Sequence, residues 1–333
     1  MTQFARVQPR HLWKLRAKPS NGNLSLVMAR FLAHLALLVV ALVYGGNYLV
    51  AKGLMPNLIG PSGFIVLRVL GGGGLFWFVR AVIRYQQGTW ERIERADFLR
   101  LLACGTTGVA ANQLLFFNGL NVTSPVNASL IMTVNPVLVL LISAGMLGTK
   151  ITGRKMLGIA IGGAGAVALL ILGAQQTSVH ASWQGDLMVL INATSYGFYL
   201  VLVKPLMAKY KPLTVISWVF LFGALWVLPI GAQQAWAIDW AAFEPQHWQG
   251  LAYVVLATTF MVYLLNIYAL RYVQPTVVSI YIYLQPLLAT GFSWWLSQSG
   301  GVDYTTDLGW WTAACATAIF AGVALVSWPS RKK

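Results

Sequence analysis

The chain has 333 residues, of which 58% are hydrophobic and only 9% are charged, and its formal net charge is +15. A soluble globular domain carries about a quarter charged residues, so this composition excludes an ordinary soluble fold. The apolar residues form blocks of about 20, the length that a helix needs to cross the hydrocarbon core of a bilayer.

Ten such blocks follow one another along the chain, and we expect each to be a transmembrane helix. They cover approximately residues 31–51, 62–85, 97–118, 124–147, 155–174, 185–205, 212–232, 247–270, 274–297 and 308–328. Residues 1–30 and 329–333 are polar and basic, and we expect them to be tails. No short alternating strands occur between the blocks, so the predicted fold class is an all-α integral membrane protein.

The basic residues fall on one side of the predicted topology. All but two of the 23 lysines and arginines lie in the N-terminal tail, in alternate loops and helix ends, or at the C-terminus. By the positive-inside rule, both termini are then cytoplasmic, in a multi-pass protein of the cell inner membrane. The positive charge is explained as a topology signal, so the expected partners are the lipid bilayer and a small-molecule substrate, with no nucleic acid.

The second half of the chain repeats the first. SPVNASLIMTVNPVLVLL in the fourth span matches QPTVVSIYIYLQPLLATG in the ninth at a constant offset, which aligns Asn135 with Gln285 and Pro136 with Pro286. YGGNYLVAKGLM and YGFYLVLVKPLM relate the first span to the sixth in the same way. Five spans per repeat, residues 31–174 and 185–328, make the second repeat enter the membrane from the opposite side. Inverted repeats are typical of secondary transporters, whose substrate sites lie near the midplane between the halves.

The two amide–proline pairs occupy equivalent positions of the repeats. Proline leaves one helix carbonyl without its usual partner, which a membrane tolerates only against protein or a water-filled cavity. An ordinary kink between packed helices is one interpretation. The symmetric recurrence favours the other, in which Pro136 and Pro286 act as hinges that gate a central cavity.

YGGNYLVAK in the first span, GFIVLRVL in the second and the fourth-span stretch, in this order, resemble the drug/metabolite transporter superfamily, and within it the EamA-type ten-helix transporters. The resemblance covers about residues 31–328. It implies two inverted five-helix repeats around a central cavity that spans one, three, four, six, eight and nine surround. The family often has Leu-Gly-Glu after the fourth span, whereas this chain has Thr149 at the acidic position, which leaves the substrate open.

Polar and aromatic side chains share faces on these same six spans and are the candidate substrate-binding residues. They are Tyr44, Asn47, Tyr48, Asn112, Phe116, Asn135, Tyr196, Tyr199, Tyr263, Asn266, Tyr281 and Gln285. Hydrogen bonding between helices is the alternative role for each of them. Arg68, in the second span, is costly to bury and is therefore a functional candidate by default; its alternative is snorkelling to the outer headgroups. Lys52 and Lys204 end their helices, where a cation suits the helix dipole.

Three classes of function remain. A transporter that exports amino acids or similar neutral or zwitterionic compounds by alternating access is favoured; phosphorylated-sugar or nucleotide-sugar exchange would require several clustered cations. A non-transporting receptor is the second class. An enzyme is disfavoured because no catalytic motif or acid pair occurs in the spans.

We expect no cofactor or metal, no disulfide between Cys104 and Cys315, and a monomer or weak homodimer. No acidic residue is predicted at the midplane, which favours facilitated diffusion or exchange, with Asp186 as the possible exception.

Overall fold

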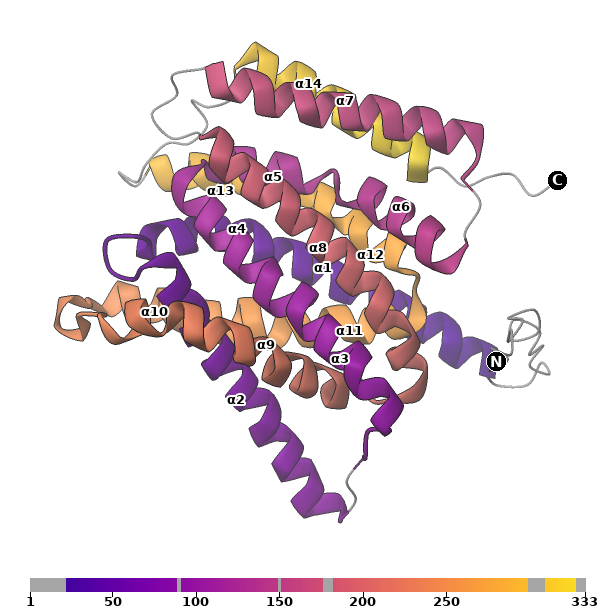
Figure 1. The fold of residues 1–333 in the computed structure, drawn as a ribbon, viewed down its shortest axis with the longest axis vertical. Coiled ribbons are helices and arrows are strands. Elements are labelled where there is room, and N and C mark those ends of the chain that lie inside the picture. Colours follow the sequence, from indigo (N-terminus) through magenta and orange to yellow (C-terminus); the bar gives the residue numbers. More distant parts are fainter. Residues whose placement is uncertain (1–21, 89–90, 149–150, 176–181, 299–308, 328–333) are drawn as a thin grey trace, which may run out of the picture.

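The computed structural model describes residues 22–88, 91–148, 151–175, 182–298 and 309–327, and all regular structure within these ranges is helical (Figure 1). The α-helices are α1 (Gly22–Leu54), α2 (Pro61–Gln87), α3 (Phe98–Gly105), α4 (Ala111–Val122), α5 (Pro125–Met132), α6 (Asn135–Leu147), α7 (Gly153–Gln175), α8 (Trp183–Lys209), α9 (Pro212–Trp236), α10 (Pro245–Ala252), α11 (Val262–Tyr272), α12 (Pro275–Ile280), α13 (Leu284–Ser297) and α14 (Trp310–Ser327). Short 3₁₀ segments are η1 (Arg95–Asp97), η3 (Trp240–Ala242) and η5 (Tyr281–Tyr283), and π-helical segments are η2 (Thr106–Ala110) and η4 (Tyr253–Met261).

Seven of the described segments are long and apolar enough to cross a membrane. They are Leu26–Leu54, Pro61–Gln87, Pro125–Met146, Trp183–Lys209, Pro212–Trp236, Pro245–Tyr272 and Pro275–Ser297. The continuous stretch from α3 through η2 to α4 is of similar length, but the amides of Asn112, Gln113 and Asn118 lower its hydropathy.

Local sequence signals explain where many helices begin and end. Proline occupies the first position of α2, α5, α9, α10 and α12, where its missing N–H costs nothing because that position has no intrahelical partner. At their C-terminal ends, α2 and α6 stop at Gly88 and Gly148, both with a φ of 65°. Glycine adopts this left-handed conformation without steric cost and so ends a helix cleanly. α1 differs from the prediction, since it begins at Gly22 and includes part of the segment 1–30 expected to be a tail.

The fourth and ninth predicted spans are each interrupted just before the amide–proline pair. α5 ends at Met132 and α6 starts at Asn135, with Thr133 and Val134 bonded to carbonyls three residues back. In the ninth span, the 3₁₀ segment η5 separates α12 from α13. The expected continuous, kinked helices are therefore pairs of half-helices, because a proline at the start of the second half cannot donate to the first.

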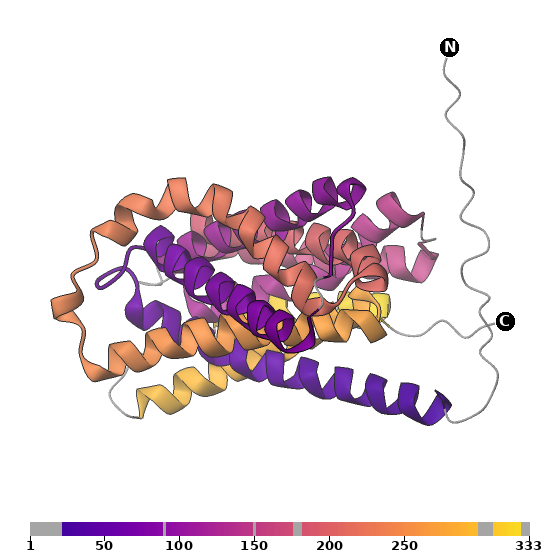
Figure 2. The same ribbon diagram turned by 90° about the horizontal axis from the view of Figure 1, so that it is seen from below.

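The helices pack in recurring pairs. α7 lies along α14 at one edge of the bundle, and α2 lies along α9, while α4 packs on α8 and α1 packs on α11 and α13 (Figure 1). Close approach at the α7–α14 pair depends on glycine: a Cβ atom on Gly322 would come within 2.3 Å of the backbone nitrogen of Gly162. Gly162 and Gly322 thus form a helix–helix contact within the chain. The N-terminal end of α1 extends past its neighbours (Figure 2), and Phe31 there is 62% exposed.

Candidate functional site

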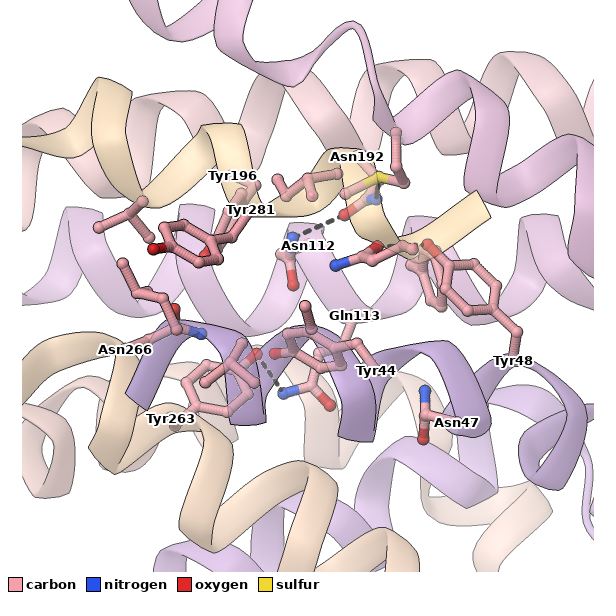
Figure 3. Close-up of a pocket in the computed structure, with 18 of the residues that line it drawn as sticks. Tyr44, Asn47, Tyr48, Asn112, Gln113, Asn192, Tyr196, Tyr263, Asn266 and Tyr281 are labelled. Atoms are coloured by element: carbon pink, nitrogen blue, oxygen red, sulfur yellow. Dashed lines mark hydrogen bonds between the residues drawn. The ribbon is translucent and has the colours of Figure 1, made fainter. Parts of the chain in front are cut away.

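A cavity lies between the half-helices and the surrounding spans, and the space within its lining, including the part open to solvent, is about 690 Å³. The lining residues come from α1, α2, α4, α5, α8, α11, α12, η5 and α13; they are Leu37, Val40, Ala41, Tyr44, Asn47, Tyr48, Arg68, Asn112, Gln113, Phe116, Phe117, Met132, Asn192, Tyr196, Tyr263, Asn266, Val278, Tyr281, Ile282 and Gln285. Figure 3 shows the tyrosines and amides facing one another across this space.

All but two of the predicted substrate-binding residues line the cavity. The structure places Asn135 and Tyr199 outside the lining and buries both. Asn135 donates from its side-chain nitrogen to the Ala193 carbonyl at 2.7 Å. The Tyr199 ring packs so closely on Gly108 that a Cβ atom there would lie 2.3 Å from it. A polar face in a helix bundle contacts several neighbours, so these two positions connect helices.

Other lining residues were not among the predicted site residues. Gln113 and Asn192 belong to polar faces that the sequence shows, and adjacency to Asn112 and Tyr196 is the signal for them. The remaining additions carry no such signal. They are Leu37, Val40, Ala41, Phe117, Met132, Val278 and Ile282. An aliphatic side chain in a transmembrane helix looks the same in sequence whether it faces lipid or a cavity.

Neutral hydrogen bonds connect the cavity walls across helices. The Tyr48 hydroxyl donates to Oε1 of Gln285 at 2.8 Å, joining α1 to α13. The Asn112 and Asn192 side chains are 2.6 Å apart, joining α4 to α8 (Figure 3). Such bonds satisfy buried polar groups that would otherwise be costly in a membrane. They also leave amide and hydroxyl groups at the cavity surface.

A third bond is made by two residues at equivalent positions of the two halves. Nε2 of Gln113 donates to the Tyr263 hydroxyl at 3.2 Å, and that hydroxyl donates to the carbonyl of Gly108 at 3.2 Å. Gly108 belongs to the π-helical segment η2. π-Segments are rare and frequently occur at functional sites. No residue pattern indicates η2 or η4.

Arg68 is the charged residue of the lining, and it is only 2% exposed. Its Nε donates to Oε1 of Gln113 at 3.1 Å, and Nη1 donates to Oδ1 of Asn47 at 3.3 Å and to Oγ1 of Thr258 at 3.1 Å. Nη2 donates to the Thr258 carbonyl at 3.4 Å. The Phe117 ring centroid lies 4.7 Å from Cζ. This burial excludes snorkelling to the headgroups as the role of Arg68.

The sequence model of the EamA-like transporter family matches the chain twice, at residues 31–171 and at residues 183–328. This chain belongs to the EamA-like transporter family. It is therefore a membrane transporter of the drug/metabolite transporter superfamily, with multiple apolar helices.

Relatives of this EamA-like transporter are also transporters by name. An uncharacterized transporter of Archaeoglobus fulgidus is 24% identical over 276 residues, which are 83% of this chain and 92% of that protein. A probable terminal-alkyne amino-acid exporter of Streptantibioticus cattleyicolor is 31% identical over 140 residues, 42% of this chain and 46% of that protein. A solved crystal structure shares the fold with a TM-score of 0.58 at 17% identity, covering 90% of this chain and 97% of its own.

Two lysines of the transporter make the same kind of contact at separate places. Nζ of Lys52 donates to the carbonyls of Leu120, Asn121 and Thr123 at 2.8, 2.8 and 2.9 Å, where α4 ends. Nζ of Lys204 donates to the carbonyls of Leu270 and Val273, where α11 ends. Each ammonium group therefore caps the carbonyls at the C-terminus of a neighbouring helix. The sequence predicted that each lysine ends its own helix: Lys52 does lie in the last turn of α1, whereas Lys204 lies five residues before the end of α8. The carbonyls that both lysines contact belong to a neighbouring helix, which the sequence did not indicate.

Asp186 is fully buried near the start of α8, outside the cavity lining. Its carboxylate accepts from Oγ1 of Thr123 at 2.5 Å and from Nδ2 of Asn127 at 3.3 Å. These bonds connect α8 to the end of α4 and to α5. Thr123 thus lies between Asp186 and the ammonium group of Lys52.

A charged cluster lies at helix ends, with Asp97 directly before α3 and Lys209 the last residue of α8. The Asp97 carboxylate accepts from Nζ of Lys209 at 2.8 Å and from the Tyr210 hydroxyl at 2.7 Å. Nζ of Lys209 also contacts the Glu94 carboxylate at 2.8 Å. The hydrogen bond from the Lys209 ammonium group stabilises the ionised carboxylate and lowers the pKa of Asp97 below its ordinary value.

In the part of the chain that the structure describes, no three His, Cys, Asp or Glu side chains come together as a set of metal ligands. Cys104 and Cys315 are buried and free. The groups that the cavity does present are one guanidinium, several amides and phenols, and aliphatic side chains. This set can bind a small polar molecule by charge, hydrogen bonds and apolar contact.

Proposed function

We propose that this EamA-like transporter exports small zwitterionic metabolites, with amino acids as the leading class, by alternating access through the cavity. The observation that carries the proposal is the lining itself: amides and phenols from both halves of the chain converge around one buried guanidinium. Such a surface solvates a compound that is polar but carries little net charge. The partial similarity to a probable terminal-alkyne amino-acid exporter supports the same class.

The proposed architecture is ten transmembrane helices in two inverted repeats, residues 31–174 and 185–328. Lys52 and Lys204 support it, because they occupy the same place in the repeated motif. Each also caps the helix end that is equivalent in its repeat, α4 for Lys52 and α11 for Lys204. The Gln113–Tyr263 bond also supports it. Residues related by a two-fold axis contact each other only close to that axis, so this bond is expected near the centre of an inverted repeat.

In this proposal, the interrupted helices are the elements that move during transport. Each break lies next to the cavity, since the lining includes Met132 and Ile282, each four residues before a proline, Pro136 or Pro286. A break in the backbone hydrogen bonds lets one half-helix tilt while the other stays packed. In the proposed cycle, the two breaks alternate in opening the cavity to opposite sides of the membrane.

We place the protein in the cytoplasmic membrane as a monomer or weak homodimer, in contact with lipid and small-molecule substrate and with no role in nucleic-acid binding. Both termini are cytoplasmic in this proposal because the basic loops lie on that side. Cysteines introduced at Gln87 and Trp236, both exposed, test it. The first should react with a membrane-impermeant thiol reagent from the cytoplasmic side and the second from outside; labelling of both from one side would contradict the topology.

Exchange of phosphorylated sugars is the weaker alternative. A phosphate group carries up to two negative charges, and binding it usually requires several cations. Among the described lining residues Arg68 is the single cation, while Lys52 and Lys204 donate to helix-end carbonyls elsewhere. A receptor that binds the same compounds without moving them would have the same cavity.

Proteoliposome counterflow distinguishes these possibilities. The purified full-length chain would be reconstituted with one unlabelled compound inside and its labelled form outside, using amino acids, amines, sugar phosphates and nucleosides in turn. The proposal predicts uptake of labelled amino acids that exceeds protein-free liposomes and is competed by other amino acids. Counterflow of sugar phosphates alone would contradict it, and binding without counterflow would indicate a receptor.

A further inference from the structure

The charge of Arg68 is not balanced by an acid. Its hydrogen-bond partners Gln113, Asn47 and Thr258 are all neutral, and its side chain makes no ion pair with any residue that the structure describes. Burying a cation without an anion is costly in a membrane protein. A buried cation of this kind is a candidate binding group for an anion that comes from outside the protein.

The guanidinium group of Arg68 makes one hydrogen bond from Nε at 3.1 Å and three from Nη1 and Nη2, of which two are longer. Its Nε is bonded to Gln113, whose own amide nitrogen is held by Tyr263. The edge formed by Nη1 and Nη2 has contacts at 3.1, 3.3 and 3.4 Å to Asn47 and Thr258. Charge-assisted hydrogen bonds are typically about 2.7–2.9 Å long. Asn47 lines the cavity whereas Thr258 does not, so the 3.3 Å contact with Asn47 is the one that a carboxylate in the cavity could replace with a shorter bond.

The plane of the guanidinium is held in place from the side. Cζ lies 4.7 Å from the ring centroid of Phe117 and 5.8 Å from that of Phe64. Aromatic faces attract guanidinium groups and restrict their orientation. An oriented, planar fork binds a carboxylate through two parallel hydrogen bonds, which a lysine cannot do.

The opposite region of the lining is apolar. Leu37, Val40 and Ala41 on α1 and Val278 and Ile282 on α12 and η5 contribute no charge or hydrogen-bonding side chain. Leu37 precedes Asn47, the Arg68 partner, by nearly three helical turns, which is about 15 Å along α1. The cavity is therefore positive at one end and mainly apolar at the other, where the Tyr281 hydroxyl is bonded to His34.

We propose that the guanidinium group of Arg68 binds the carboxylate of the transported compound while the apolar end takes its side chain. The substrate class is then amphipathic carboxylates, of which amino acids with large apolar side chains are examples. The inference rests on the proposed transport function and narrows it. The ammonium group of such an amino acid is accommodated by the amide and phenol oxygens of the wall, but the carboxylate is the required group.

Three compounds with the same phenethyl group separate the contributions. 3-Phenylpropionate carries only the carboxylate, L-phenylalanine carries both charges, and 2-phenylethylamine carries only the ammonium group. Stabilisation of the purified full-length protein against thermal unfolding in detergent reports binding of each. Wild type should bind the first two roughly 10- to 100-fold more tightly than the amine, since hydrogen bonds to charged groups contribute that range. Glycine, which lacks the apolar part, should bind weakly.

Arg68→Gln should remove the preference for the carboxylates, and Arg68→Lys should reduce it by losing the two-donor fork while keeping the charge. Arg80→Gln is the matched control, because Arg80 lies on the same helix, is 5% exposed and is outside the lining. It should keep the wild-type order of affinities. If Arg68→Gln does not fold, the wild-type series and Arg68→Lys still decide the matter.

Equal binding of amine and carboxylates by wild type, or an unchanged preference in Arg68→Gln, would overturn the inference. So would the absence of binding by every carboxylate tested. Counterflow of another compound class in the same preparation would then leave transport standing and refute only the carboxylate assignment. Loss of all counterflow, with carboxylate binding intact and sensitive to Arg68, would instead refute transport and retain the assignment.

Discussion

Replacing Lys52 with methionine tests the helix-end caps. The substitution keeps much of the aliphatic side chain and removes three charged hydrogen bonds, to the carbonyls of Leu120, Asn121 and Thr123. Each bond to a charged group contributes roughly 1.5–3 kcal/mol, but carbonyls at a helix end recover part of this from water. We expect a net loss of about 2–4 kcal/mol. Lys204→Met removes two bonds and should cost about 1–3 kcal/mol by the same reasoning.

Thermal unfolding of the full-length protein in detergent measures both losses. At roughly 2 °C per kcal/mol for a chain of this size, Lys52→Met should lower Tm by about 4–8 °C. Lys211→Met is the control, because this lysine is exposed and its ammonium group makes no hydrogen bond or ion pair with the described residues, only its backbone N–H being bonded, to Glu91. Surface substitutions of that kind change stability by about 0.5 kcal/mol or less. A Tm for Lys52→Met within about 1 °C of the control would refute the reasoning that these caps hold the bundle together.

Three further predictions concern gating, coupling and pH. Pro136→Ala and Pro286→Ala should leave Tm nearly unchanged but slow counterflow several-fold, because a continuous helix resists the tilt; wild-type rates in both would remove the hinge role. Asp186→Asn should leave counterflow nearly unchanged, since Asp186 lies outside the cavity; uphill accumulation driven by a proton gradient and lost in this variant would make it the coupling residue. Because the Lys209 ammonium group lowers the pKa of Asp97, the carboxylate stabilises the fold above its ordinary pKa and loses that effect as pH falls through the lowered value. Asp97→Asn should therefore lower Tm at pH 7, with the difference shrinking below about pH 4; a difference that grows on acidification would contradict the assignment.

The sequence predicted the helices well where the signal is local. Long apolar stretches and an initial proline, as at Pro61 and Pro212, depend only on neighbouring residues. The breaks before Pro136 and Pro286 were anticipated as kinks, since the missing N–H is visible in the sequence. The π-helical segments were not, because no residue type in η2 or η4 marks an extra residue in the turn.

The candidate site shows what helix periodicity does not predict. Periodicity indicates which residues share a helix face, but it does not indicate which neighbour that face meets. Tyr196 and Tyr199 were predicted together, yet Tyr196 lines the cavity and Tyr199 packs against Gly108. Arg68 was recognisable as costly, whereas its contacts with Asn47 and Thr258 depend on helices far apart in the sequence. Tertiary packing decides both outcomes.

Accessibility of one cavity position from both sides of the membrane tests alternating access most directly. Ala41 is small and lines the cavity, so Ala41→Cys, in a chain with Cys104 and Cys315 replaced by alanine, places a single thiol on the transport path. In proteoliposomes, the account predicts reaction with an impermeant thiol reagent added to either side, slower reaction in the presence of substrate, and loss of counterflow after labelling. Reaction from one side only, with counterflow unaffected by labelling, would contradict the claim that substrate passes through this cavity.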